Sequence, residues 1–233
     1  MERYGRIQEK DKREIVLLKG FPCAWGKCTF CDYIEDNAHD SEEMIKTNKN
    51  ILEKITGEFG KLEVINSGSV FELPAQTLID IKKKVEEKNI KTIVFEVYYN
   101  YRTRLNEIRD FFEDINVEFK TGVETFDEYF RNAVLKKGII FEDENEVKNY
   151  FDVICLLVGM LGQTKEMIRE DIRKSEVFER VCINIFVDNS TVVKSDPELI
   201  KWFKEEYGHL ENDDKYDILW NNTDFGVGGE ENK

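Results

Sequence analysis

The stretch Gly20-Phe-Pro-Cys-Ala-Trp-Gly-Lys-Cys-Thr-Phe-Cys-Asp-Tyr33 places three cysteines in one short loop, at the end of the first strand-like run of the chain. They are Cys23, Cys28 and Cys31, with four residues between the first two and two between the last pair. Three thiolates can hold three irons of a [4Fe–4S] cube and leave the fourth iron open to a non-protein ligand. The loop therefore favours a reactive cluster over one that only stores electrons.

Structural zinc is the alternative for the same residues, because His39 would complete a Cys3His tetrahedron with the three cysteines. Zinc modules are short and self-contained, whereas this loop opens a long pattern of strands and helices, so we favour the iron–sulfur cluster. The chain has five cysteines, an odd count, and its charged start, Met1 to Glu14, is unlike a secretory signal. We expect no disulfides and a cytoplasmic location that is reducing and poor in oxygen.

The composition limits the class of protein. At 233 residues, with 41% hydrophobic residues and no apolar run of membrane-spanning length, the chain fits one compact domain that is not embedded in a membrane. A formal net charge of −14 repels polyanions, so we expect no nucleic-acid partner. No linker interrupts residues 1–233, which predicts a single domain with a core over residues 13–207 and a tail or lid over 211–233.

Six apolar runs rich in Val, Ile and Phe alternate with amphipathic segments, which is typical of βα units around a parallel sheet. The sequence therefore predicts an α/β fold, a partial (β/α)6 barrel of parallel strands with a C-terminal tail. In such a barrel reactive groups gather at the carboxyl ends of the strands, where the cysteine loop is expected. The predicted strands are Glu14–Lys19, Leu62–Asn66, Thr92–Val97, Val117–Val123, Asp152–Val158 and Val181–Val187.

The cysteine spacing, and the aromatic Phe30 just before the last cysteine, resemble the radical S-adenosylmethionine (SAM) superfamily, whose commonest loop is one residue shorter in its first gap. The order of motifs is similar to that family's partial barrel from Arg13 to Tyr207. The resemblance implies a [4Fe–4S] cluster on the three cysteines, with SAM on the open iron and Phe30 beside the cofactor. It also implies an electron donor such as flavodoxin or ferredoxin.

The resemblance implies further SAM contacts at later strand ends. The run Asn66-Ser-Gly-Ser69 is similar to the glycine-rich turn that receives the SAM amino group, which makes Ser67, Gly68 and Ser69 candidate ligands. The other candidates are Glu96 for the ribose hydroxyls, Glu124 in a Gly-Val-Glu run, Lys136 for the SAM carboxylate and Asn184 in the last predicted strand. Two of these residues have an alternative interpretation. Glu96 could be a carboxylate at the barrel rim that pairs with a lysine, and Asn184 could form a hydrogen bond with a neighbouring strand end.

The cysteine loop, the Asn-Ser-Gly-Ser turn and the small size look like the queuosine-salvage lyases of anaerobic bacteria. This resemblance implies radical chemistry on a ribose that releases queuine, a 7-deazaguanine base, from queuosine or its 5′-phosphate. The substrate would be a small-molecule nucleoside held by aromatic and charged groups, while the cluster and SAM carry the chemistry without an assigned catalytic side chain. The candidate substrate residues are Tyr33, Glu35, Tyr98, Tyr101, Arg102 and Asp188.

Two other functions stay open. One is a radical SAM enzyme with a different substrate, acting in tRNA modification or in activation of a glycyl-radical enzyme. The other is a non-enzyme, an iron–sulfur or zinc protein used for structure or electron transfer. Histidine-centred hydrolysis is a poor competitor because the chain contains only His39 and His209. Cys155 and Cys182 lie within predicted strands and are interpreted as buried small hydrophobes.

Overall fold

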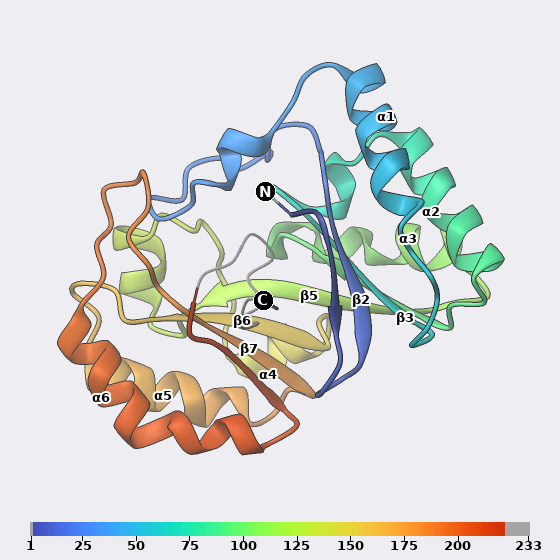
Figure 1. Ribbon diagram of the computed structural model, residues 1–233. Helices are drawn as coiled ribbons and strands as arrows, with labels where there is room; N and C mark the ends of the chain where they lie inside the picture. The colour runs from blue at the N-terminus through green and yellow to red at the C-terminus, as the bar shows by residue number, and fades with distance from the viewer. Residues whose placement is uncertain (1, 222–233) are drawn as a thin grey trace. The chain divides into compact units, whose positions relative to one another are not determined.

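The computed structural model describes residues 2–221 of the chain (Figure 1). These residues divide into two compact units, which are described one at a time. Within the described part of the chain, unit 1 consists of residues 2–26 and 33–120, and unit 2 of residues 27–32 and 121–221. The single-domain organisation expected from the sequence stays a prediction.

Unit 1 is built on strands that follow one another in chain order. The first pair is antiparallel and the later pairs are parallel. The β2 strand is buried along its whole length, as its continuous apolar run predicts. The strands are β1 (Tyr4–Ile7), β2 (Arg13–Leu18), β3 (Lys61–Asn66), β4 (Thr92–Glu96) and β5 (Asn116–Glu124), of which the last ends in unit 2.

Three helices connect the parallel strands of unit 1. They are α1 (Ser41–Leu52), α2 (Ala75–Glu87) and α3 (Leu105–Phe111), and α1 and α2 pack side by side (Figure 1). Asp40 starts α1 by accepting hydrogen bonds from two backbone N–H groups of its first turn. Apolar residues at helical spacing, such as Ile81 in α2, are buried, as the sequence pattern predicts.

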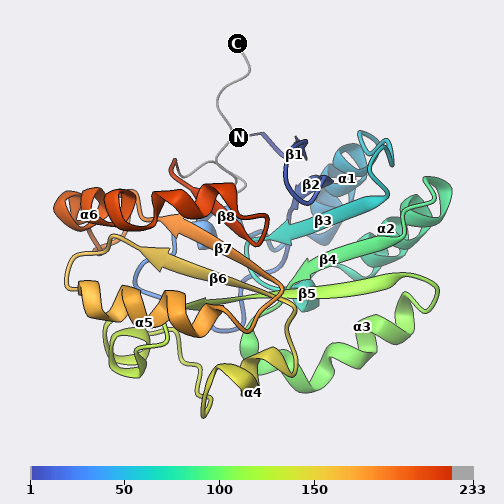
Figure 2. The same ribbon diagram turned by 90° about the horizontal axis from the view of Figure 1, so that it is seen from below.

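Unit 2 also alternates strands and helices, and its strands are parallel in the order β6-β7-β8. The helices α5 and α6 run along these strands (Figure 2). The elements are α4 (Glu144–Lys148), β6 (Val153–Val158), α5 (Lys165–Ser175), β7 (Arg180–Ile185), α6 (Pro197–Tyr207), the 3₁₀-helix η5 (Gly208–Asn212) and β8 (Tyr216–Leu219). Within residues 2–221 no helix is both long enough and apolar enough to cross a bilayer.

The α/β class with parallel strands in chain order is confirmed. All six predicted strands are present as β2 to β7, with ends within two residues of the prediction. Two further strands were not predicted. β1 was missed, and β8 lies where the sequence predicts a tail or lid. β8 pairs with β7, and the side chains of Tyr216, Ile218 and Leu219 are buried. Its backbone also forms hydrogen bonds with the edge of β7, whose N–H and C=O groups would otherwise lack strand partners. Residues 222–233 of the predicted tail lie outside the described residues.

Three charged side chains are buried together in unit 1. Glu63 on β3 accepts hydrogen bonds from Arg13 Nε and from Lys120 Nζ, each at 2.5 Å. Burial favours the neutral acid, but the two cations outweigh it and lower the pKa of Glu63 to about 2. The carboxylate is therefore ionised at neutral pH and neutralises two cations that the surrounding apolar strands cannot stabilise.

We expect Glu63→Gln to lower the free energy of unfolding by about 3–5 kcal/mol near neutral pH, because it leaves two buried cations beside a neutral amide. The folded-state pKa lies below the unfolded value of 4.5, so the contribution of Glu63 is present above pH 4.5 and is lost as the pH falls toward 2. The variant should therefore lose less stability than the parent on acidification, as urea titrations at neutral and acidic pH would measure.

The control is Glu107→Gln, which breaks an exposed pair with Arg104 and should change stability by less than about 1 kcal/mol. Equal losses in the two variants would contradict the structural role of Glu63.

Candidate functional site

The cysteine loop, residues 20–33, follows β2 and belongs to both units: Cys23 to unit 1, and Cys28 and Cys31 to unit 2. These three cysteines are partly exposed and form no disulfide within residues 2–221. In the same part of the chain no three His, Cys, Asp or Glu side chains are already grouped as a metal site. The assignment of the three cysteines as ligands therefore stays a prediction from spacing and thiol chemistry.

In unit 1 the carboxylate of Glu72 joins three segments. Its Oε2 accepts a hydrogen bond from the Ser69 backbone N–H at 2.6 Å. Its Oε1 accepts from the Tyr101 hydroxyl at 2.9 Å and from the Ala24 backbone N–H at 3.4 Å. Glu72 ends the short 3₁₀-helix η2 (Val70–Glu72) and is 6% exposed. Burial raises the pKa of Glu72, and the donors from Tyr101, Ser69 and Ala24 oppose that rise.

The predicted glycine-rich turn lies against the cysteine loop within unit 1. A Cβ atom on Gly68 would lie 3.1 Å from Oε2 of Glu72 and 3.5 Å from Cα of Cys23, so the turn approaches the loop closely because position 68 has no side chain. Ser69 is fully buried, and its Oγ has no hydrogen-bond partner among residues 2–221. A buried hydroxyl without a partner is costly, which marks this turn as a place for a polar ligand.

Aromatic rings surround the same part of unit 1. Trp25 of the cysteine loop stacks on Tyr98, with ring centroids 6.2 Å apart and planes 22° apart. Tyr98 in turn meets Tyr101 edge to face at 6.3 Å. Burial and the hydrogen bond to Glu72 raise the pKa of Tyr101 to about 12, so its hydroxyl stays protonated and acts as a donor. The structure thus places two predicted substrate residues, Tyr98 and Tyr101, beside the cysteine loop.

In unit 2 an ion pair lies beside the second half of the loop. Lys137 Nζ is 2.5 Å from Oε1 of Glu124, and the two side chains are 14% and 7% exposed. The ammonium also lies 5.6 Å from the centroid of the Phe30 ring. Burial opposes the charge of Lys137, but Glu124 and the thiols of Cys28 and Cys31 outweigh it and raise the pKa of the ammonium above its usual value. A fixed positive charge therefore lies beside two of the predicted metal ligands.

Local backbone features hold this arrangement. A Cβ atom on Gly122 would lie 2.2 Å from the carboxylate and 2.8 Å from the ammonium of the pair, so only glycine leaves room for it. Thr29 of the loop donates its backbone N–H to the Leu135 carbonyl at 3.0 Å and its hydroxyl to the Val134 carbonyl at 2.8 Å. These bonds fix the second half of the loop to the segment that follows β5.

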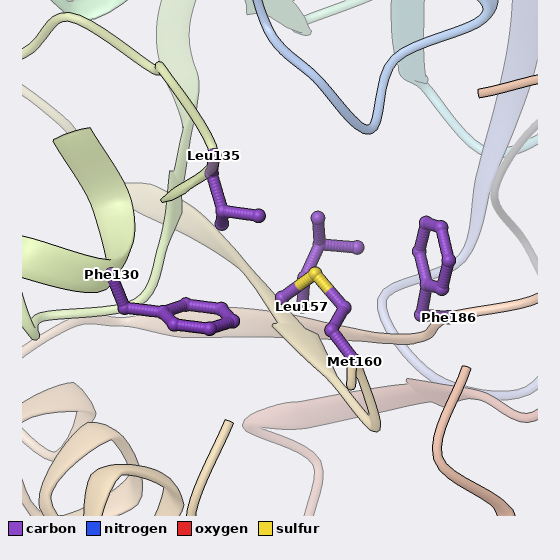
Figure 3. Close-up of a cluster of buried hydrophobic side chains, with 5 residues drawn as sticks. All are labelled: Phe130, Leu135, Leu157, Met160 and Phe186. Carbon is purple, nitrogen blue, oxygen red and sulfur yellow. The ribbon is translucent and has the colours of Figure 1, made fainter. Parts of the chain in front are cut away.

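An apolar cluster in unit 2 supports the aromatic residue of the loop. Its members converge on one space from the segment after β5 and from the ends of β6 and β7 (Figure 3). Phe30 packs against this cluster. Phe30 therefore lies against apolar side chains that offer no hydrogen-bond partners to water. The buried members are Phe130, Leu135, Leu157, Met160 and Phe186.

A buried carboxyl group fixes the turn after β5. Asp171 of α5 accepts hydrogen bonds from the Phe126 backbone N–H at 2.6 Å and from the Thr125 hydroxyl at 3.1 Å. Burial raises the pKa of Asp171 to about 7, although both donors oppose the rise. The proton on this side chain is therefore gained or lost close to neutral pH.

Lys136, which the sequence predicts to bind the SAM carboxylate, does not take part in the ion pair of Glu124. Lys136 is exposed and has a φ of +52°, a left-handed turn that points the next residue in another direction. Lys137, which the sequence analysis missed, instead forms the pair with Glu124. Glu124 itself has a φ of +67°, an uncommon conformation for a residue with a side chain and one that often marks a functional site.

The other predicted residues are half-buried or exposed, apart from the buried Ser67, and make separate contacts. Within its own unit the structure places Glu96 at 4.0 Å from the Lys120 ammonium, which is the rim pairing considered from the sequence. The rest are Tyr33 and Glu35 in the 3₁₀-helix η1 (Tyr33–Asp36), Ser67 bonded to Asn37, Arg102 over the ring of Tyr99, Asn184 accepting from the Cys182 thiol, and Asp188 accepting from the Ser195 backbone N–H.

Glu72 was also missed by the sequence analysis, although a signal for it exists. The run Ser69-Val-Phe-Glu72 has the pattern of a capping box, in which a glutamate returns a hydrogen bond to the backbone three residues earlier.

Comparisons with known proteins include a strong match among solved structures. No protein-family model matches the chain. An uncharacterized protein of Methanocaldococcus jannaschii is 27% identical over 217 residues, which cover 82% of this chain but 59% of that protein, so the chain spans about three fifths of this relative. Among solved structures, a queuine lyase from Clostridium spiroforme bound to SAM and queuine is 54% identical, with a TM-score of 0.94 over 98% of this chain and 100% of that chain. SuiB from Streptococcus suis shares the fold, with a TM-score of 0.54 and 14% identity over 88% of this chain and 48% of that chain.

The buried Asp171 predicts a particular pH dependence of stability. Its folded-state pKa of about 7 lies above the ordinary value of 3.8, so its contribution to stability is complete below pH 3.8 and is lost as the pH rises through 7. We expect Asp171→Asn, which keeps an acceptor for Phe126, to remove a slope of up to about 1.4 kcal/mol per pH unit in this window. Thermal unfolding at several pH values would measure the slope.

Asp143→Asn alters an exposed helix cap whose pKa is lowered by backbone N–H groups, and it should leave this slope in place. An unchanged slope in the Asp171 variant would contradict the assignment.

Proposed function

The chain belongs to the queuine lyase family of radical SAM enzymes, and from this premise we propose that it releases queuine from queuosine or queuosine 5′-phosphate by radical chemistry on the ribose. The resemblance to this family noted in the sequence is confirmed by the match to the Clostridium spiroforme enzyme, and that match carries the proposal. Loss of a hydrogen atom from a ribose carbon would open the glycosidic bond to fragmentation and free the base.

A bound [4Fe–4S] cluster with SAM would supply the radical that takes this hydrogen atom. Cys23, Cys28 and Cys31 would hold three of the irons. The residues fit the group because the three cysteines form no disulfide within residues 2–221, and because the ammonium of Lys137 offsets negative charge beside the last two. Thiolate ligands need a reducing setting, so we place the enzyme in an oxygen-poor cytoplasm with flavodoxin or ferredoxin as electron donor.

The turn after β3 is suited to the ammonium of SAM. Ser69 presents a buried hydroxyl whose Oγ is unpartnered within residues 2–221, and Gly68 allows a close approach of the backbone. We assign the SAM carboxylate to Lys137 in place of the exposed Lys136, because an enclosed ammonium in the site region forms a stronger charge-assisted hydrogen bond. The other SAM residues in the proposal are Phe30, Ser67, Glu96, Glu124 and Asn184.

The substrate base is assigned to the aromatic groups of unit 1. The stacked rings of Trp25 and Tyr98 offer a flat apolar surface for a deazapurine, and Tyr101 offers a protonated hydroxyl at its edge. Arg102, held over the ring of Tyr99, would meet a 5′-phosphate. Tyr33, Glu35 and Asp188 are exposed in the structure and would line the entrance.

The chain's own contribution to the reaction is to position its ligands and to exclude water. The hydrogen bonds of Glu72 and Thr29 fix the cysteine loop, and the apolar cluster behind Phe30 shields one side of it. A radical is consumed by any nearby hydrogen donor, so a rigid and dry site directs it to one carbon of the substrate.

Anaerobically reconstituted protein tests the activity directly. With SAM, dithionite and either queuosine or queuosine 5′-phosphate, we expect free queuine to accumulate, and no queuine when SAM or the reductant is omitted. Cys28→Ala should abolish the product, whereas the matched Cys155→Ala, a buried cysteine of β6, should retain it.

Liquid chromatography with mass spectrometry would follow queuine and 5′-deoxyadenosine together. Formation of 5′-deoxyadenosine without queuine from both substrates would contradict the substrate assignment, and full activity of the Cys28 variant would contradict the cluster assignment.

The two adjacent lysines give a second test. Loss of a charge-assisted hydrogen bond costs about 1.5–3 kcal/mol, so Lys137→Met should raise the KM for SAM by about ten-fold or more, while Lys136→Met should leave it unchanged. Because Lys137→Met leaves the buried Glu124 without its cation, the double variant Lys137→Met with Glu124→Gln is measured alongside, with circular dichroism as the folding check. A larger effect of the Lys136 variant would restore the assignment made from the sequence.

A further inference from the structure

We propose that Glu72 is a positioning residue, which holds the Cys23 half of the cysteine loop, the turn that receives SAM and the substrate residue Tyr101 in one fixed arrangement. The inference rests on the proposed function. It adds a residue that none of the sequence motifs of the family resemblance contained.

The first observation is that both carboxylate oxygens of Glu72 are used. Oε2 takes the backbone N–H of Ser69, and Oε1 takes the backbone N–H of Ala24 together with the hydroxyl of Tyr101. Ala24 follows Cys23 directly in the chain, so the bond to its N–H restrains the cysteine. One buried group therefore contacts the cysteine loop, the turn after β3 and Tyr101.

The second observation is that the backbone of Glu72 holds the same loop. Its carbonyl accepts the Phe21 N–H at 2.8 Å. A Cβ atom on Gly20 would lie 3.2 Å from that carbonyl oxygen and 2.9 Å from Nδ2 of Asn66, so the start of the loop is pressed against this segment. The loop is thus bonded to Glu72 through Phe21, two residues before Cys23, and through Ala24, directly after it.

The third observation concerns the charge of the group. Three donors converge on two oxygens, and a carboxylate can accept all of them, whereas an amide has a single acceptor oxygen and an NH₂ group that donates. Glutamine at position 72 would keep the bond from Ser69 through its oxygen. Its NH₂ group would then face the Ala24 N–H, and two donors repel each other.

A purely local role for Glu72 would be to cap the short helix η2, because Ser69 and Glu72 stand at capping-box spacing. Glutamine serves this capping role as well as glutamate does. Glu72→Gln therefore separates the two roles. If Glu72 only caps the helix, the variant should resemble the native protein. If Glu72 positions the cysteine loop, the variant should fold but its loop should be displaced.

The first measurement uses protein without cluster or SAM and does not depend on activity. Amide hydrogen exchange in the segment 20–26 should become about ten-fold faster in Glu72→Gln, because the Ala24 N–H loses the side-chain oxygen that holds this segment in place. Exchange in the core strand β3 should stay unchanged, which shows that the variant is folded. Unchanged exchange in the segment 20–26 would overturn the proposal.

The second measurement uses the reconstituted holoenzyme. In Glu72→Gln the change that SAM produces in the electron paramagnetic resonance spectrum of the reduced protein should be incomplete, and kcat/KM for SAM should fall about ten-fold. Tyr101→Phe removes one donor but keeps the bonds to Ala24 and Ser69, so it should alter the KM for queuosine and leave the SAM-dependent spectrum unchanged. If Glu72→Gln and Tyr101→Phe gave the same SAM-dependent spectrum, the hydrogen bond from Ala24 to Glu72 would not be what positions the loop.

The matched control is Glu146→Gln, which alters a glutamate that accepts the Glu142 backbone N–H beside α4 in unit 2. It should change neither the exchange of segment 20–26 nor the SAM-dependent spectrum. If queuosine is not the substrate, the exchange and SAM readouts still decide the role of Glu72, so failure of the proposed function and failure of this inference give different results.

Discussion

The site depends on how the cysteine loop is held, because most of this loop has no regular secondary structure of its own. In unit 1 the Glu72 carboxylate accepts the Ala24 N–H, and in unit 2 Thr29 donates two hydrogen bonds to the segment after β5. Phe30 adds an apolar contact to the second half. A few directed bonds to the segments after β3 and after β5 thus replace the missing secondary structure, and in the proposed function these bonds fix the thiols.

Buried charge is balanced locally in both units, although the chain as a whole is strongly acidic. Glu63 lies between two cations, and Lys137 lies against Glu124. These groups serve different ends. The first pairing stabilises the strands of unit 1, whereas the second keeps a positive charge beside Cys28 and Cys31, where an iron–sulfur cluster with thiolate ligands would add negative charge.

The sequence predicts the parts of the structure whose signals are local and repetitive. Six strands were recognisable because burial on both faces makes them continuously apolar. The three cysteines predicted as cluster ligands stand out because their spacing is short. β1 and β8 were missed because four-residue strands carry too few apolar residues to stand out. The choice between Lys136 and Lys137 depends on a left-handed backbone turn, and the role of Glu72 on contacts to residues 29 and 48 positions away, which no local pattern contains.

The central claim is that three cysteines of one loop hold a [4Fe–4S] cluster whose fourth iron binds SAM. Mössbauer spectroscopy of protein reconstituted anaerobically with ⁵⁷Fe tests it most directly, with and without SAM. The account predicts a cubane spectrum in which one iron site changes on addition of SAM while the other three do not. Bound zinc without iron, or a cluster whose iron signals do not change when SAM is added, would contradict this claim.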